Sequence, residues 1–494
     1  MLTTLAAPAF ADIWRIEDGD ITVKAGETKG TNKVSQGTTI DKVDTNTIIT
    51  GTSDTNTVTI DTSKGNVDVT FDDLNIDASS RNEAAMSVTG SGNTTIKLDG
   101  DNHLTGGNGR SGIDSIGNLT IYGGENDSLT AKGGSGADGS GGDGIHSGSL
   151  TIYGGTVNAN GGNCGDGNYS DGGSGIRISS RSLTIYDGKV NAKGGNGGDG
   201  NYSDGGSGIS SNGSLTVSGG TVTANGGNGG SGGGNGGDGI TSNGGVTISS
   251  GSTVTANGGR GEDGSGGSGI SNGGSLTVSD GTVTAKGGNG DSKDGYGGDG
   301  IRSGGGVTIS GNTVNAAGGN GGKVGGYGIC SFDRVAISGG TVEAAGGSSG
   351  SSNGGSGIYS SDIDLSGSLE LTAKAGSPNG KALSQKGSEL ELDTIKDKLG
   401  PGAKVTATDA DGKVIDQVSI PRPVEPEESS SSSDGGSAAP SAPASLLPGL
   451  TVTDKSGQRI SYTSTQSGNA LTVCVGRFTA SFPHLAGRAA SAAG

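Results

Sequence analysis

The stretch GISSNGSLTVSGGTVTANGG, at Gly208–Gly227, contains the pattern that decides the fold. Apolar and polar residues alternate along Leu215–Ser218 and again along Thr221–Ala224, and a period of two is typical of half-buried β-strands. Leu215 and Val217 therefore face a core, whereas the threonine and serine between and after them face outward. The glycine pair that separates the two strands permits a corner with positive φ.

This pattern recurs nine times along the chain, with a period near 31 residues. Each unit opens on a Gly-Ile pair, and the isoleucines are Ile113, Ile145, Ile176, Ile209, Ile240, Ile270, Ile301, Ile329 and Ile358. A period of this length indicates a repeat architecture in which each unit stacks on the previous one. At a strand spacing of about 4.8 Å, leucine lies over leucine and valine over valine. The sequence predicts an all-β fold, a right-handed parallel β-helix solenoid with glycine-rich loops.

Composition and charge narrow the functional classes. The 494 residues include 109 glycines and only 28% hydrophobic residues, too few for an ordinary compact core. The 10 prolines and the lack of a three-residue glycine period exclude collagen. A net charge of −18 argues against nucleic acid or an anionic membrane as a partner. No segment approaches the roughly 20 apolar residues of a membrane span.

The glycine-rich loops pose an energetic problem. The loop at Gly226–Gly239 has fourteen residues, and fixing each residue costs about 1–2 kcal/mol. The few aliphatic side chains of one coil contribute only about 1.5–3 kcal/mol each. We therefore expect these loops to be mobile, or to be held by backbone hydrogen bonds between loops or by a bound ion.

Changes in composition divide the chain into six parts. Ala9-Phe10-Ala11 matches the small-x-small pattern of a signal-peptidase site, so we expect export. Pro, Ser and Ala dominate the segment before residue 447, which predicts a disordered linker. The expected parts are a signal peptide remnant (1–11), an N-terminal cap with irregular coils (12–112), the nine repeats (113–361), C-terminal coils and a cap with a short helix at Glu391–Leu399 (362–420), the linker (421–446) and a truncated β module (447–494).

The segment upstream of the repeats carries a family resemblance. Residues 49–80 read ITGTSDTNTVTIDTSKGNVDVTFDDLNIDASS, and TTIKLDGDNHLTGG and many GGTVTANGG-type units follow. Over most of residues 35–420 the chain resembles secreted carbohydrate-binding β-helix proteins of Gram-positive anaerobic bacteria. The resemblance implies a pectate-lyase-like solenoid, secreted or on the cell surface, that binds acidic polysaccharide without cleaving it, sometimes with calcium.

Five tyrosines are the candidate carbohydrate-binding residues. Tyr122, Tyr153 and Tyr186 end the strands NLTIY, SLTIY and SLTIY in three consecutive coils, where the alternation points them outward. Tyr169 and Tyr202 lie in two identical copies of GDGNYSDGGSGI. Aromatic rings of this kind stack on sugar rings. The alternative is a cross-strand aromatic ladder that only stabilises the fold, worth about 0.5–1.5 kcal/mol per pair.

Three aspartates are candidate calcium ligands. GGNGGDGIT, at Gly233–Thr241, matches the calcium-binding nonapeptide GGxGxDxUx, in which carbonyl and carboxylate oxygens bind the ion. Close variants at Asp138–His146 and Asp294–Arg302 extend the candidate set to Asp143, Asp238 and Asp299. The motif occurs at most once per coil, so purely structural turns are the alternative. Ca²⁺ is the one cofactor that the sequence suggests.

Catalysis and ice binding have less support. Asp166/Asp171 and Asp199/Asp204 lie in glycine loops without a recurring basic residue, a poor arrangement for paired-carboxylate chemistry. Outward Thr-x-Thr pairs, as in arrays that order ice, are interrupted at Lys189. We expect an exported, non-enzymatic protein that binds polysaccharide, such as a host or cell-wall glycan, or acts as an adhesin. The alternatives are a structural surface spacer without a ligand and a polysaccharide lyase or hydrolase.

Overall fold

The computed structural model of the chain describes residues 12–137, 139–422, 463–467, 470–475 and 478–483. The predicted signal peptide and nearly all of the predicted linker lie outside these residues. The chain divides into two units, Met1–Pro423 and Val424–Gly494. In the second unit, an antiparallel sheet contains β34 (Thr463–Ser467), β35 (Ala470–Val475) and β36 (Phe478–Pro483). None of the helices described is long and apolar enough to cross a membrane.

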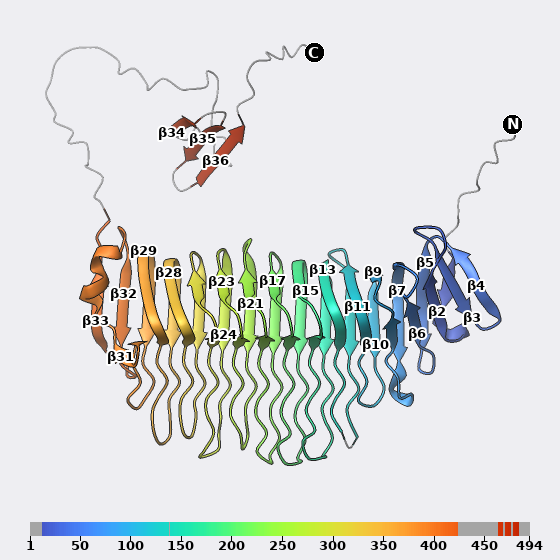
Figure 1. The fold of residues 1–494 in the computed structure, drawn as a ribbon, viewed down its shortest axis with the longest axis horizontal. Coiled ribbons are helices and arrows are strands. Elements are labelled where there is room, and N and C mark those ends of the chain that lie inside the picture. The colour runs from blue at the N-terminus through green and yellow to red at the C-terminus, as the bar shows by residue number, and fades with distance from the viewer. Residues whose placement is uncertain (1–11, 138, 423–462, 468–469, 476–477, 484–494) are drawn as a thin grey trace, which may run out of the picture. The chain divides into compact units, whose positions relative to one another are not determined.

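The first unit is an all-β parallel solenoid of about 11 turns (Figure 1). Its strands form one 33-stranded sheet, and coils pair in parallel along the whole solenoid. The nine repeat isoleucines, from Ile113 to Ile358, pair consecutively in register. Each is 0% exposed. The predicted stacking of the repeats is confirmed.

Where the strands of a coil are separate there are up to three of them, one more than the sequence predicted. In one coil these are β16 (Ile209–Ser211), β17 (Leu215–Val217) and β18 (Thr221–Asn225). The additional strand is the one that Ile209 begins, and this residue pairs in register with the isoleucines of the coils on both sides. At the corner between β17 and β18, Gly220 has a φ of +71°, as its position predicted.

The other strands of the repeat region follow the same plan, and several run through the corners as one continuous strand. They are β11 (Ile113–Tyr122), β12 (Ser128–Lys132), β13 (Ile145–Asn160), β14 (Ile176–Ile178), β15 (Leu183–Lys193), β19 (Ile240–Ser242), β20 (Val246–Ile248), β21 (Ser252–Asn257), β22 (Ile270–Asn272), β23 (Leu276–Val278), β24 (Gly281–Lys286), β25 (Ile301–Ser303), β26 (Val307–Ile309), β27 (Thr313–Ala317), β28 (Ile329–Ala345) and β29 (Ile358–Lys374).

The N-terminal part combines parallel coils with an antiparallel cap. Its elements are β1 (Ile13–Arg15), η1 (Ile16–Asp18), β2 (Ile21–Ala25), β3 (Asn32–Gln36), β4 (Thr39–Asp44), β5 (Thr47–Ser53), β6 (Val58–Asp61), β7 (Val67–Asp77), η2 (Ala78–Ser80), β8 (Met86–Thr89), β9 (Asn93–Asp99) and β10 (Asp101–Thr105). β3 pairs antiparallel with both β2 and β4. The indole N–H of Trp14 donates a 2.9 Å hydrogen bond to the buried carboxylate of Asp44, which anchors this cap.

The C-terminal end is covered by a short helix and a hairpin. Its elements are β30 (Leu383–Gln385), β31 (Ser388–Glu389), the 3₁₀ helix η3 (Leu392–Lys398), β32 (Lys404–Thr408) and β33 (Val414–Ser419). The predicted short helix is thus present, and it buries Leu392 and Ile395 against the core. β33 pairs antiparallel with β32, so the last parallel strand does not end as an open edge.

The glycine-rich loops lie side by side as extended arms that project from one side of the strands (Figure 1). Each loop has an outgoing and a returning arm, and the arms of successive coils are hydrogen-bonded in alternation. The Gly227 N–H donates to the carbonyl of Gly206 at 2.8 Å, Gly237 donates to Gly227 at 2.8 Å, and Gly259 donates to Gly237 at 2.7 Å. We call this layer the glycine slab (the loops between residues 133 and 380). It is held by backbone hydrogen bonds between loops, one of the three possibilities expected.

Close backbone approach explains why the slab consists of glycine. A Cβ atom on Gly227 would lie 1.9 Å from the carbonyl oxygen of Gly195, and one on Gly206 would lie 2.0 Å from that of Gly173. Side-chain amides connect the loops as well. The side-chain oxygen of Asn196 accepts the backbone N–H of Asn228 at 3.0 Å, and the side-chain oxygen of Asn228 accepts the backbone N–H of Arg260 in the next coil.

Replacing a glycine inside the slab should therefore destabilise the solenoid. In Gly227→Ala the new methyl group collides with backbone, so we expect a loss of about 2 kcal/mol or more in the free energy of unfolding. Gly139→Ala is the matched loop control, because its Cβ would meet no atom within 4 Å. Urea unfolding measures both variants, and equal midpoints for the two would contradict the slab's role.

Candidate functional site

Three tyrosines form a stacked row on the outer face of the solenoid. Tyr122 ends β11, Tyr153 lies in β13 and Tyr186 lies in β15. The ring centroids of Tyr122 and Tyr153 are 4.7 Å apart with an interplanar angle of 4°, and those of Tyr153 and Tyr186 are 4.8 Å apart at 10°. We call this row the tyrosine ladder. Its spacing follows from the strand spacing, because each ring occupies the outward position directly over the ring below.

Stacking determines which surfaces of the ladder a ligand can reach. The inner ring faces cover one another, yet the side chains remain 43%, 41% and 47% exposed in chain order. A ligand therefore meets three hydroxyl-bearing ring edges and the outer faces of the two end rings. The neighbouring residues partly desolvate the Tyr153 hydroxyl, and this desolvation is the main reason that its pKa is raised. The flanking Tyr186 and Tyr122 raise it further. The hydroxyl thus stays neutral and able to donate a hydrogen bond.

Two polar columns run parallel to the ladder on the same face. The first column consists of threonines that lie two residues before the ladder position on each strand and pair in register: Thr95, Thr120 and Thr151. A further two residues away, the Asn118 amide donates to the Asn93 side-chain oxygen at 2.8 Å, and the Ser149 hydroxyl donates to Asn118 at 2.7 Å. Columns two residues apart along a strand are about 7 Å apart. The face thus presents aromatic edges, hydroxyls and amides in parallel rows.

Tyr169 and Tyr202 form a second stacked pair at another place in the coil. Their ring centroids are 5.6 Å apart at 15°, and the side chains are 73% and 60% exposed. Both residues have a positive φ, 58° and 56°, which is uncommon for a bulky side chain. They lie in the loops of the glycine slab, whereas the ladder lies at the corner between the second and third strands of its coils. The structure does not bring the two groups together through any described bond.

The three candidate calcium ligands all bond to the backbone of the next coil. Asp143 accepts the N–H of Ser174 at 2.7 Å, Asp238 that of Ser268 at 2.6 Å, and Asp299 that of Tyr327 at 2.7 Å. Arg177 also pairs with Asp143, and Arg302 with Asp299. Within the described residues, no three His, Cys, Asp or Glu side chains gather as a metal site would require. The aspartates therefore have a structural explanation as ties between coils, while calcium binding stays a prediction.

Burial shifts the titration of these carboxylates. Burial is the largest influence on Asp238 and raises its pKa to about 6, against the lowering effects of the Ser268 N–H and of Arg302. The pKa of Asp299 is raised for the same first reason, and Arg302 opposes the shift. Folding therefore favours the protonated form of Asp238.

Sequence reasoning missed several groups that the coils bring together. Tyr327 and Tyr359 stack with centroids 4.9 Å apart. The two tyrosines are about one repeat period apart, which could have predicted that they stack, but their flanking sequences differ and do not align as a repeat. A second group is a carboxylate pair near the ladder. The pKa of Asp72 is raised, first by burial and then by the carboxylates of Asp99 and Asp73. Register places Asp72 beside Asp99 in the next coil.

Comparison of the chain with protein-family models, curated proteins and solved structures finds no match. The β-solenoid that the resemblance implied is present in the fold. Membership of the carbohydrate-binding family stays a prediction.

The Asp238→Asn variant tests how much the charged, buried Asp238 carboxylate lowers the free energy of unfolding. The folded pKa is about 6 and the unfolded value is about 3.9, so the folded chain binds the extra proton and wild-type stability falls as pH rises from 4 to 6. Asparagine keeps the acceptor oxygen for Ser268 and has no charge. Its stability relative to wild type should rise by about 2 kcal/mol between pH 4 and pH 7, as measured by unfolding at each pH. A stability difference between variant and wild type that stays constant from pH 4 to pH 7 would refute this account.

Calcium removal is a separate test. Because the three aspartates already bond to backbone N–H groups in different coils, we expect the same melting temperature in excess chelator and in millimolar CaCl₂. Thermal unfolding followed by circular dichroism measures both. A melting temperature that rises with calcium concentration, as mass action requires of a bound ion, would restore Asp143, Asp238 and Asp299 as ligands.

Proposed function

We propose that this chain is an exported, non-enzymatic β-solenoid that binds polysaccharide along the face of the tyrosine ladder, in the manner of a carbohydrate-binding protein or adhesin. The observation that carries the proposal is the exposed ladder and its two parallel columns of hydroxyls and amides. Sugars present hydroxyls around an apolar ring, and such a face offers donors, acceptors and aromatic surface together.

The regular spacing suits an extended chain rather than a small molecule. The ladder and its flanking columns repeat once per coil, so a polymer lying along the solenoid axis meets the same groups at each step. Ring edges and hydroxyls bind sugar hydroxyls, and the outer face of Tyr186 can stack on one sugar ring because the next coil carries the small Ser218 in the corresponding strand position. Rigid strands hold these groups, which reduces the entropy lost on binding.

Two other functions remain as alternatives. A spacer that holds another domain away from a surface needs the stacked coils but no ligand, and the ladder would then serve packing alone. A polysaccharide-cleaving enzyme needs an acid and a base, and the raised pKa of Asp72 beside Asp99 is the observation that favours it.

Affinity electrophoresis through gels containing pectin, mucin or bacterial wall polysaccharide tests the proposal. Wild type should be retarded in at least one gel. The triple variant Tyr122→Phe, Tyr153→Phe, Tyr186→Phe keeps the stacked rings and removes three hydroxyls, so we expect it to bind at least about tenfold more weakly. Alanine at the same positions should abolish retardation. The matched control is the pair Tyr327→Phe, Tyr359→Phe, which lies many coils away and should leave retardation unchanged.

Other results would favour one of the two alternative functions. Wild type that migrates freely in every gel, and binds nothing on a glycan array, would favour the spacer. Reducing or unsaturated sugar ends released from the polysaccharide would identify an enzyme, and loss of this release in Asp72→Asn would assign it to the carboxylate pair.

A further inference from the structure

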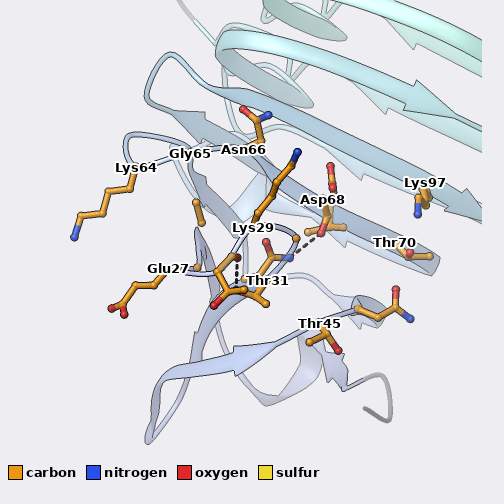
Figure 2. Close-up of a pocket in the computed structure, with 17 residues that line it drawn as sticks. Glu27, Lys29, Thr31, Thr45, Lys64, Gly65, Asn66, Asp68, Thr70 and Lys97 are labelled. Carbon is orange, nitrogen blue, oxygen red and sulfur yellow. Dashed lines mark hydrogen bonds between the residues drawn. The ribbon is translucent and has the colours of Figure 1, made fainter. Parts of the chain in front are cut away.

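A cavity of about 460 Å³ lies at the N-terminal end of the solenoid (Figure 2). It is bounded by the loop between β2 and β3, the turns before β5 and β7, and the outer faces of β7 and β9. Its volume falls in the range of small-molecule sites and exceeds that of one sugar ring. Neither the tyrosines nor the aspartates discussed above contribute to it.

Three lysines from separate segments line this cavity. Lys29 belongs to the β2–β3 loop, Lys64 to the turn before β7, and Lys97 to β9. Figure 2 shows Lys29 reaching across toward the side of Asn66 and Asp68, Lys97 beside Thr70, and Lys64 extending outward at the rim. We call these three residues the lysine basin.

The basin carries an excess of positive charge. None of its lysines belongs to an ion pair among the described residues. Of the two carboxylates in the lining, Glu27 is paired at 2.7 Å with Lys33, which does not line the cavity, so Asp68 is the carboxylate left to offset the three lysines. Three cations against one such carboxylate contrast with a chain of net charge −18. Because charges beyond about 8 Å are largely screened at physiological salt, the local excess decides which ligand binds.

The walls of the cavity are fixed before any ligand binds. The buried side-chain amide of Asn32 donates to the Asp68 carbonyl at 2.7 Å and to the Thr47 hydroxyl at 2.9 Å, which ties β3 to two coils. The Gly26 N–H donates to the Thr31 carbonyl at 2.8 Å and closes the loop that carries Lys29. A binding site on such rigid elements loses little freedom on binding.

We propose that the lysine basin binds the phosphate or sulfate ester group of a sugar or polyol. Lys29 and Lys97 can donate to a tetrahedral oxyanion from two sides, and Lys64 adds positive charge at the rim, because the oxyanion spreads its charge over several oxygens. A carboxylate offers only two oxygens, against the three terminal oxygens of a phosphate or sulfate ester, so fewer of the lining donors can bond to it at once. Thr70, Asn66 and the Asp68 carboxylate then bond to hydroxyls of the same ligand.

The position of Lys97 relates this site to the tyrosine ladder. Lys97 pairs in register with Thr70 on one side and with Tyr122 on the other. Lys97 therefore continues the ladder's own column at its N-terminal end, and it is the residue of the basin that adjoins the ladder. A glycan along the ladder would meet the basin at that end, but the basin binds its ester group without the ladder.

Calorimetric titration of the full chain with glucose 6-phosphate, glucose 6-sulfate, glucuronate and glucose tests the proposal. One or both esters should bind, which also tells phosphate from sulfate, while glucuronate binds at least tenfold more weakly and glucose gives no heat. The double variant Lys29→Gln, Lys97→Gln should weaken ester binding at least tenfold. Lys189→Gln with Lys193→Gln, two exposed lysines of β15, is the charge-matched control and should leave it unchanged.

Three results would overturn the proposal: no heat with either ester, glucuronate binding as tightly as the esters, or ester binding unaffected in Lys29→Gln, Lys97→Gln. Melting curves of both lysine variants that coincide with wild type show that folding is intact. The ladder phenylalanine variant should bind the esters like wild type. Failure of the ladder and failure of the basin are therefore separate outcomes.

Discussion

The in-register hydrogen bonding of parallel backbone from coil to coil is the constraint on which the rest of this structure depends. Apart from a few register shifts at the corners, it sets each strand residue over its counterpart one repeat earlier, at one strand spacing. Nine buried isoleucines become one continuous core column for this reason. The same rule turns three outward tyrosines into a stacked ladder and a few asparagines into hydrogen-bonded rows. A residue type that recurs at one position of the repeat thus forms a continuous column along the solenoid.

The glycine slab shows how a chain so poor in hydrophobic residues orders long loops. Apolar burial from a few aliphatic residues per coil does not offset the entropy of fixing fourteen loop residues. The arms instead satisfy their backbone groups against one another, at distances that a Cβ atom would prevent. Aspartate and asparagine side chains add ties to the next coil's N–H groups. The acidic motifs that resemble calcium loops acquire a structural purpose in this way.

The candidate binding surface combines two kinds of order. The ladder and its polar columns come from the repeats, so their spacing is regular and suited to a polymer. The lysine basin comes from the irregular N-terminal coils and cap, where segments distant in sequence line one open pocket. Lys97 belongs to both, because its strand lies between the cap and the first tyrosine. A repeated surface and a single pocket therefore share one face of the solenoid.

The sequence by itself determined the solenoid, the inward and outward faces of the strands, the short helix near Leu392 and the common column of the three tyrosines. All of these follow from local alternation and a fixed period, which a linear pattern records. Only the tertiary structure decided the additional strand that begins at the repeat isoleucine, the pairing of the glycine arms, the partners of Asp143, Asp238 and Asp299, and the position of Lys29, Lys64 and Lys97 around one pocket. Backbone bonds between glycines leave no side-chain pattern, and the lysines follow no period. Their proximity arises from how the cap folds over the first coils, which only three-dimensional packing specifies.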